Sequence, residues 1–153
     1  ETQRELLTPY AAWYAERAGQ VTQQEFVQAE LLATQMYSEL SKVFANYELM
    51  ICPTTAVEGV PADFDYSQDT IEIDGQAVDA KFGWVMTYPF NMLSRCPVLT
   101  IPAGRASNNV PIGLQLVAPT YEDATVFRAA AAYEGAFSAE NSPFVSIHNY
   151  PTL

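Results

Sequence analysis

The side chains closest to a metal-binding pattern lie in the acidic stretch, residues 58–79, which holds seven carboxylates and no basic residue. Its oxygen donors near the offsets of a calcium loop are Asp63, Asp65, Ser67, Asp69 and Asp74. A helix–loop–helix calcium site needs glycine at its sixth position and a bidentate glutamate at its twelfth. The stretch has Gln68 and Asp74 at these positions. We therefore expect a solvated acidic segment and no metal site.

Nucleophilic catalysis needs a hydroxyl or thiol beside a base, and the chain offers few such pairs. The single histidine, His148, lies in a polar C-terminal segment, where chain ends are loosely held. Ser41 and Lys42 are neighbours on an expected helix, so their side chains point about 100° apart. None of the seven glycines is next to another, and neither a Gly-x-Ser-x-Gly nor a phosphate-binding loop occurs. We assign no catalytic residue to this chain.

Three other reactive or polar side chains lie in apolar, strand-like surroundings. Cys52 and Cys96 share no metal-ligand spacing and are expected to be buried free thiols. Gln115 has apolar neighbours on both sides and is expected to be a buried amide whose hydrogen bonds are satisfied. These residues give no reason to expect a cofactor.

Helical signals dominate the first third of the chain. A threonine–proline start and a following glycine predict a helix over residues 9–18. Thr22 and Glu25 form a capping box that opens an amphipathic helix over residues 23–46. Its apolar stripe comprises Phe26, Ala29, Ala33, Met36, Leu40, Val43 and Tyr47. Such a helix is about 36 Å long, so we expect it to flank a sizeable sheet.

Short apolar runs bounded by proline or polar turns predict three strands, at residues 49–52, 97–102 and 112–117. A polar, turn-rich segment joins the last two, which favours antiparallel pairing. All three runs are apolar enough to be covered on both faces. Within the acidic stretch, Asp74-Gly75 suits a tight turn and predicts a small surface hairpin at about 70–79.

Two more helices are expected in the second half of the chain. Residues 82–93 are apolar but contain Pro89, where we expect the helix to kink or end. Thr120 and Asp123 repeat the capping pattern and predict an Ala-rich helix that runs to residue 134.

Composition places the chain among globular proteins, because 49% of its 153 residues are hydrophobic and 16% are charged. We expect residues 1–153 to be one unit, with a helix and strand body at 1–136 and a tail at 137–153. The net charge of −11 opposes phosphate backbones and anionic membrane surfaces, which excludes nucleic acid as an expected partner. No apolar run approaches the roughly 20 residues that span a bilayer, so we expect no membrane partner.

Four segments, in a fixed order, resemble the C-terminal part of amidase signature family enzymes. They are residues 47–55 (YELMICPTT), 87–91 (TYPFN), 96–104 (CPVLTIPAG) and 110–117 (VPIGLQLV), with the helix ending RAAAAYE at 134 after them. The resemblance covers about residues 7–134. Any one segment alone is a generic strand and turn, whereas all of them in order are specific.

The resemblance implies an α/β fold, the C-terminal part of the amidase signature fold, in which helices cover a mixed sheet. It also implies hydrolysis of carboxylic amide C–N bonds through an acyl-enzyme, by a serine that a second serine and a lysine activate. The family carries these groups, and its glycine-rich oxyanion hole, in its N-terminal and central parts. Lys42 and Lys81 do not lie in the matching motif. We therefore expect this chain to be a non-triad portion whose catalytic region precedes Glu1.

Within that fold the chain is expected to complete the sheet and to form part of a pocket wall. Tyr88, Phe90 and Met92 are candidates to face a substrate, and Asn91 to hydrogen-bond nearby backbone. A proline-interrupted apolar helix end is also ordinary scaffold, so a purely structural turn stays open as the alternative.

The expected partners are the N-terminal catalytic region and, in the full-length protein, a small amide substrate. Because the strands leave apolar surface and strand edges uncovered, we also expect self-association or a homo-oligomer. We expect a cytoplasmic location. Two other functions stay open: a non-catalytic binding or assembly subunit, and part of a glutamine-dependent amidotransferase subunit. Whether this chain alone is an enzyme is likewise left open.

Overall fold

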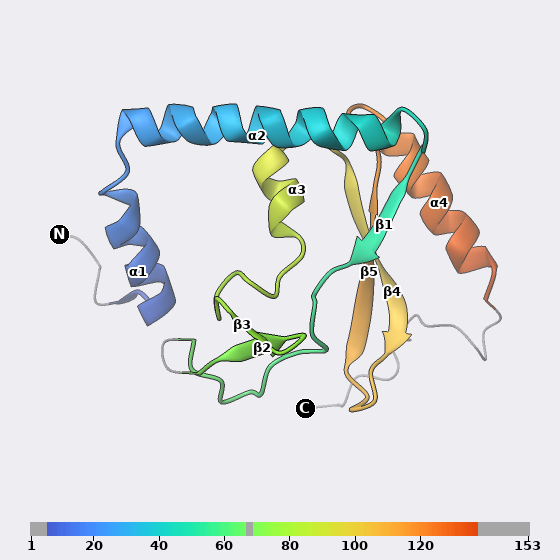
Figure 1. Cartoon of the computed structure of the whole chain (residues 1–153). Coiled ribbons are helices and arrows are strands. Elements are labelled where there is room, and N and C mark those ends of the chain that lie inside the picture. Colours follow the sequence, from blue (N-terminus) through green and yellow to red (C-terminus); the bar gives the residue numbers. More distant parts are fainter. Residues whose placement is uncertain (1–5, 67–68, 138–153) are drawn as a thin grey trace. The chain divides into compact units, whose positions relative to one another are not determined.

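The computed structural model describes residues 6–66 and 69–137, and the chain divides into two compact units, Glu1–Met36 and Tyr37–Leu153. Three residues considered above, Ser67, Gln68 and His148, lie outside the described residues, as does the predicted tail beyond its first position. Figure 1 shows the order of helices and strands along the chain.

Two helices follow the N-terminal signals. α1 (Pro9–Ala18) has the predicted bounds, and Thr8 Oγ1 accepts a hydrogen bond from the backbone N–H of Ala11 at 3.3 Å. α2 (Gln23–Phe44) begins where predicted and ends two residues before the predicted end. The sequence therefore predicts both helix starts correctly.

The capping box at the start of α2 is confirmed in both directions. The Glu25 carboxylate accepts from the Thr22 backbone N–H at 2.8 Å, and Thr22 Oγ1 accepts from the Glu25 N–H at 3.2 Å. The apolar stripe that follows is less covered than expected. Among the described residues of α2 only Ala33 is buried, whereas Phe26 is 62% exposed.

The second unit contains a three-stranded antiparallel sheet with the order β1 (Met50–Pro53), β5 (Pro111–Val117) and β4 (Val98–Arg105). The three predicted strands and the antiparallel pairing of the last two are confirmed. The central strand β5 holds the longest buried run, Gln115 to Val117, whereas β1 alternates between half-buried and exposed positions and β4 is exposed at Val98, Thr100 and Arg105. The exposed apolar side chains of the outer strands, Ile51 and Val98, agree with the expectation that the strands of this chain leave apolar surface uncovered.

Strand β4 is longer than predicted, because Pro102 does not end it. β4 is an outer strand of the described sheet, where a residue without an N–H breaks no ladder hydrogen bond on its free edge. The register shifts between Pro102 and Gly104, which leaves one extra residue on β4 opposite β5. Gly104 has φ 130°, a conformation that side-chain-bearing residues rarely adopt.

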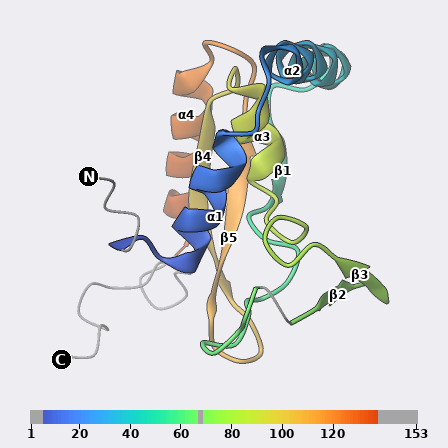
Figure 2. The same cartoon turned by 90° about the vertical axis from the view of Figure 1, so that its left-hand side faces the viewer.

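One face of the sheet packs against α4 (Asp123–Gly135), which runs along β4 and β5 in Figure 2. The buried cluster between them comprises Ile101, Leu116, Ala118 and Val126. This packing of helix on sheet confirms the α/β class. Helix α4 also confirms the predicted Ala-rich helix.

The predicted N-terminal cap of α4 is wrong, because Thr120 is not the residue that precedes the helix. Glu122 occupies the cap position and its side chain makes no capping hydrogen bond. Thr120 Oγ1 instead lies 2.7 Å from the hydroxyl oxygen of Tyr37, within the same unit. The Thr120 hydroxyl therefore hydrogen-bonds to Tyr37, which is distant in sequence, and does not cap the helix as the local pattern predicted.

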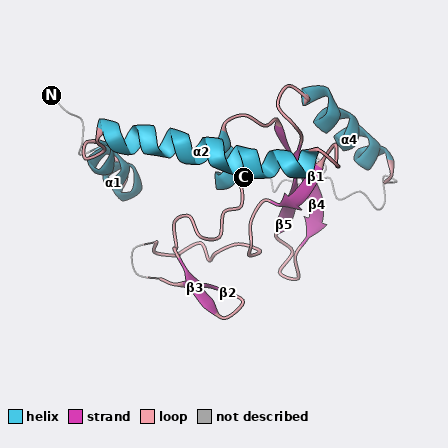
Figure 3. Ribbon diagram, turned by 45° about the horizontal axis from the view of Figure 1, so that its top comes forward, coloured by secondary structure: helices cyan, strands magenta, loops and turns pink. Residues whose placement is uncertain are grey.

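The small hairpin is confirmed, with strands β2 (Ile71–Ile73) and β3 (Gln76–Val78) separate from the larger sheet in Figure 3. Its turn residues, Asp74 and Gly75, have φ 52° and 73°. Two consecutive positive values are what a two-residue hairpin turn that matches strand twist requires.

The helix predicted over residues 82–93 is shorter and differently placed. α3 spans Tyr88–Leu93, and Pro89 lies in its first turn. Proline lacks the N–H that a first-turn residue leaves unpaired and has a helical φ, so it starts this helix and does not end or kink it. Residues 82–87 form turns interrupted by one antiparallel β-bridge between Val85 and Thr55, and Asp79 accepts from the backbone N–H of Phe82 at 2.8 Å.

Candidate functional site

The four predicted pocket-wall residues lie together on the short helix α3. Tyr88 and Phe90 are half-buried, whereas Asn91 and Met92 are exposed. The Tyr88 ring packs edge-on against Phe82, with ring centroids 4.9 Å apart. Helix α3 therefore presents an aromatic and amide surface whose first aromatic ring is held by the preceding turn.

The segment before α3 is attached to the sheet through an extension of β1. The backbone N–H of Met86 donates to the carbonyl of Thr54 at 3.0 Å, and that of Ala56 donates to Trp84 at 2.8 Å. On its other side, Thr54 donates its backbone N–H to Gly113 of β5 at 3.0 Å. Residues 84–86 thus lie beside the β1 extension much as a further short strand.

Gln115 connects these same segments from the central strand. It is fully buried, and its Nε2 donates to the carbonyl of Pro53 at 2.8 Å and to that of Met86 at 3.1 Å. Its Oε1 is also buried and has no hydrogen-bond partner within the described part of the chain. Burial of this amide is confirmed, but the expectation that all its hydrogen bonds are satisfied is wrong.

The energy of this arrangement is nearly balanced. Each neutral hydrogen bond contributes about 0.5–1.5 kcal/mol, whereas an unpaired buried acceptor costs about 1–3 kcal/mol. The Nε2 bonds to the Pro53 and Met86 carbonyls and the bare Oε1 therefore roughly cancel, and Nε2 makes a further, long contact of 3.5 Å to Cys52 Sγ. Stability alone does not explain why an amide lies here.

The two thiols are free and half-buried. Burial raises the pKa of both Cys52 and Cys96 above the ordinary value of a thiol. A raised pKa keeps sulfur protonated at neutral pH, and the protonated form is a poor nucleophile. The thiols are free as expected, but both are half-buried and not fully buried as the sequence predicted.

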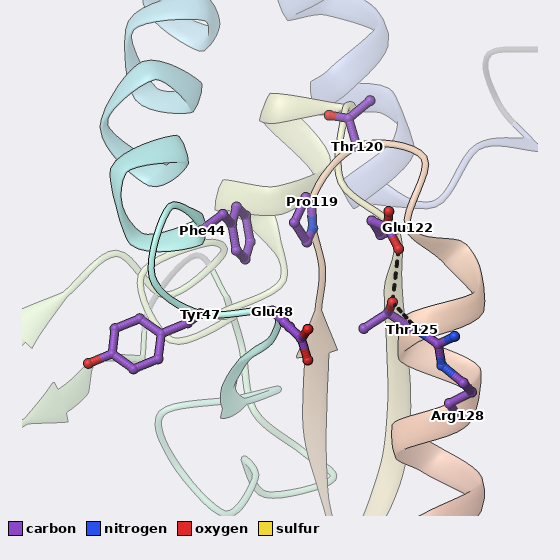
Figure 4. Close-up of a pocket in the computed structure, with 8 residues that line it drawn as sticks. All are labelled: Phe44, Tyr47, Glu48, Pro119, Thr120, Glu122, Thr125 and Arg128. Carbon is purple, nitrogen blue, oxygen red and sulfur yellow. Dashed lines mark hydrogen bonds between the residues drawn. The ribbon is translucent and has the colours of Figure 1, made fainter.

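A pocket of about 340 Å³ lies elsewhere in the second unit, between the end of α2 and the start of α4 (Figure 4). It is lined by Phe44, Tyr47, Glu48, Pro119, Thr120, Glu122, Thr125 and Arg128. One wall is a chain of hydrogen bonds, in which Arg128 donates to Thr125 at 2.9 Å and Thr125 donates to Glu122 at 3.0 Å. Some of these residues lie in the motifs described above, but no motif brings the two halves of the lining together, since they come from segments more than seventy positions apart.

The pocket lining carries two carboxylates, a guanidinium and two threonine hydroxyls, and it holds no serine, cysteine or histidine. Within residues 6–66 and 69–137, no group of three or more His, Cys, Asp or Glu side chains is placed to hold a metal ion. The helices of this same part of the chain include none that is long and apolar enough to cross a membrane.

Comparison with known proteins assigns the family. The family described as Amidase matches residues 1–127. A glutamyl-tRNA(Gln) amidotransferase subunit from Bacillus thuringiensis (strain Al Hakam) is 30% identical over 115 residues, which cover 72% of this chain and 21% of that protein. The corresponding subunit from Bacillus cereus (strain B4264) gives the same identity and coverage. The chain thus spans about a fifth of the length of these curated relatives.

Solved structures agree with this assignment. A bacterial aryl acylamidase of the amidase signature enzymes superposes with a TM-score of 0.71 at 26% identity, covering 87% of this chain and 27% of that one. A second structure, an amidase, has the same fold with a TM-score of 0.75 at 19% identity, covering 88% of this chain and 30% of its own. The family match, the relatives and the fold agree with one another, and the chain belongs to the amidase family.

Proposed function

We propose that this chain is the C-terminal, non-triad portion of an amidase that hydrolyses carboxylic amide C–N bonds through a serine acyl-enzyme. The nucleophile, its activating groups and the oxyanion hole belong, in this proposal, to a region that precedes Glu1. The observation that carries the proposal is the family match over residues 1–127 together with coverage of only 21% of a relative's length.

The local role that we propose for the chain is to complete the sheet and to supply one wall of the substrate pocket. Tyr88, Phe90, Asn91 and Met92 form that wall. Their position on one short helix, with Asn91 and Met92 exposed, supports this role because exposed amide and thioether groups are available to a ligand. Tyr88 and Phe90 supply the apolar area that such pockets use.

The test is hydrolysis of simple aromatic and aliphatic amides by the full-length gene product, with the 153-residue chain as the matched control. We expect ammonia or amine release from the longer protein and none from the chain alone. Within the longer protein, Asn91→Ala and Met92→Ala should raise KM, and Tyr121→Ala, at a residue that is 93% exposed and remote from α3 in sequence, should not. Turnover by the chain alone, or an inactive full-length protein, would contradict the proposal.

A second candidate function is that of one component of a glutamine-dependent amidotransferase, and the 30% identity to a glutamyl-tRNA(Gln) amidotransferase subunit favours it specifically. The two candidates differ in their nitrogen donor and in their need for other subunits. Glutamine hydrolysis that rises when partner subunits and their acceptor are added would favour the amidotransferase. Hydrolysis of simple amides by the protein alone would favour the amidase.

We propose that the main partner of the chain is the N-terminal catalytic region, with self-association as a second contact. Exposed apolar side chains on the sheet unit, including Ile51 at 59% and Phe127 at 63%, support this proposal. A cytoplasmic location is also part of it. The free thiols of Cys52 and Cys96 support that location, because reducing compartments keep thiols unpaired.

A further inference from the structure

The buried amide of Gln115 lies where three backbone segments meet. Its Nε2 donates to the last residue of β1 and to Met86, two residues before α3 begins. Among the described residues no backbone ladder joins Met86 to β5, where Gln115 itself resides, so the amide is a direct link from the central strand to the segment that leads into α3. Met86 lies 29 positions before Gln115 in the sequence, and Pro53 lies 62 positions before it.

The unpaired Oε1 of Gln115 helps to separate the hydrogen-bonding role of the side chain from its space-filling role. An apolar side chain of similar size, such as methionine, would fill this space and remove the bare Oε1, but it would take the Nε2 donor away from the carbonyls of Pro53 and Met86. Only the two Nε2–H groups distinguish glutamine from that replacement in the described structure. The distinguishing feature of this position is therefore the pair of bonds to Pro53 and Met86, and not filled volume.

We propose that Gln115 is a positioning residue that fixes the start of α3 against the sheet, and so sets the place of the Tyr88–Met92 wall. This inference rests on the proposed role of α3 as a pocket wall. Two bonds from one planar amide fix both distance and orientation between Pro53 and Met86. Helix α3 has only six residues, with Leu93 buried at its end, so the bonds that anchor the segment before its first turn contribute to its place.

The experiment is amide hydrogen exchange on the whole chain, without substrate, for Gln115→Met. We expect protection at the backbone N–H groups of Met86, Asn91 and Ser94 to fall by about tenfold or more, with the β4 and α4 amides unchanged. Leu116→Ala is the matched control, because Leu116 is the next residue on β5 and packs on the α4 side. It should lower protection in α4 and spare α3.

Gln115→Glu provides a second variant with a pH signature. At low pH the neutral acid retains one donor, whereas at higher pH the carboxylate opposes both carbonyls. Protection of the same three amides should therefore fall as pH rises from 5 to 8 in Gln115→Glu, and stay constant in Gln115→Met. Equal loss throughout the unit in both variants, or unchanged α3 protection, would overturn the inference. Since no substrate is present, these results are independent of whether the full-length protein hydrolyses amides.

Discussion

Replacement of Ile51 by alanine measures how much of the sheet is left for another region to cover. Ile51 lies opposite Leu116 in the β1–β5 register, yet it is 59% exposed whereas Leu116 is 3% exposed. The two side chains thus share a ladder position and differ in burial. If the longer protein covers this face, Ile51→Ala must lower the free energy of unfolding of the longer protein by more than it lowers that of the chain alone.

The magnitude follows from the exposed fraction. Full burial of an isoleucine side chain contributes about 1.5–3 kcal/mol, and a little over half of the Ile51 surface is still in water. Ile51→Ala should therefore lower the free energy of unfolding by about 1 kcal/mol in the chain alone, and by about 1–2 kcal/mol more in the full-length protein. Leu116→Ala should lower the free energy of unfolding by about 2–5 kcal/mol in both proteins, because Leu116 is already buried in the chain alone.

Urea denaturation of both proteins, with each variant, provides the assay. The decisive quantity is the difference between the two contexts, which should be large for Ile51 and near zero for Leu116. An Ile51→Ala cost that is the same in the chain and in the full-length protein would refute the reasoning. The exposed face of β1 would then be solvent-facing in the whole enzyme.

Other expectations concern turns and charges. Gly83→Ala should lower the free energy of unfolding by about 1–3 kcal/mol in urea denaturation, because a Cβ there would lie 2.7 Å from Val78 Cβ; Gly135→Ala, which meets nothing within 4 Å, should not. Hydrogen bonds from the Thr22 backbone N–H and then from its hydroxyl lower the pKa of Glu25. The ionised carboxylate therefore stabilises α2 at pH values above the ordinary carboxyl pKa, and this stabilisation is lost as the pH falls through the lowered pKa. Glu25→Gln should reduce the loss of helix signal at acid pH in circular dichroism. The acidic stretch should bind calcium no more tightly than millimolar in calorimetric titration, and a micromolar transition would show a metal site that its loop geometry does not predict.

Local signals predicted the local structure. The bounds of α1, the capping box of α2 and the Asp74-Gly75 turn were all predictable, because each depends on residues within four positions of one another. The role of Pro89 was not predictable, since proline both ends helices and begins them. The apolar run around it does not indicate which of the two roles applies.

The candidate site was less predictable than the fold because its contacts are long-range. The four residues proposed as a pocket wall could be named from the sequence, but the Gln115 bonds to Met86 and Pro53 join residues 29 and 62 positions apart. The sequence did not predict the pocket beside α4, because its two halves come from distant segments. Thr120 shows the same limit, since its hydroxyl partner, Tyr37, lies 83 positions away.

The most direct test of the central proposal is to locate the nucleophile in the full-length gene product. A fluorophosphonate, which modifies activated serine hydroxyls, should add once per molecule, and peptide mass spectrometry should place the adduct before Glu1. The 153-residue chain alone should remain unmodified under the same conditions. An adduct on a serine of this chain, or a full-length protein that stays unmodified, would contradict the account of this chain as the non-triad portion of a serine amidase.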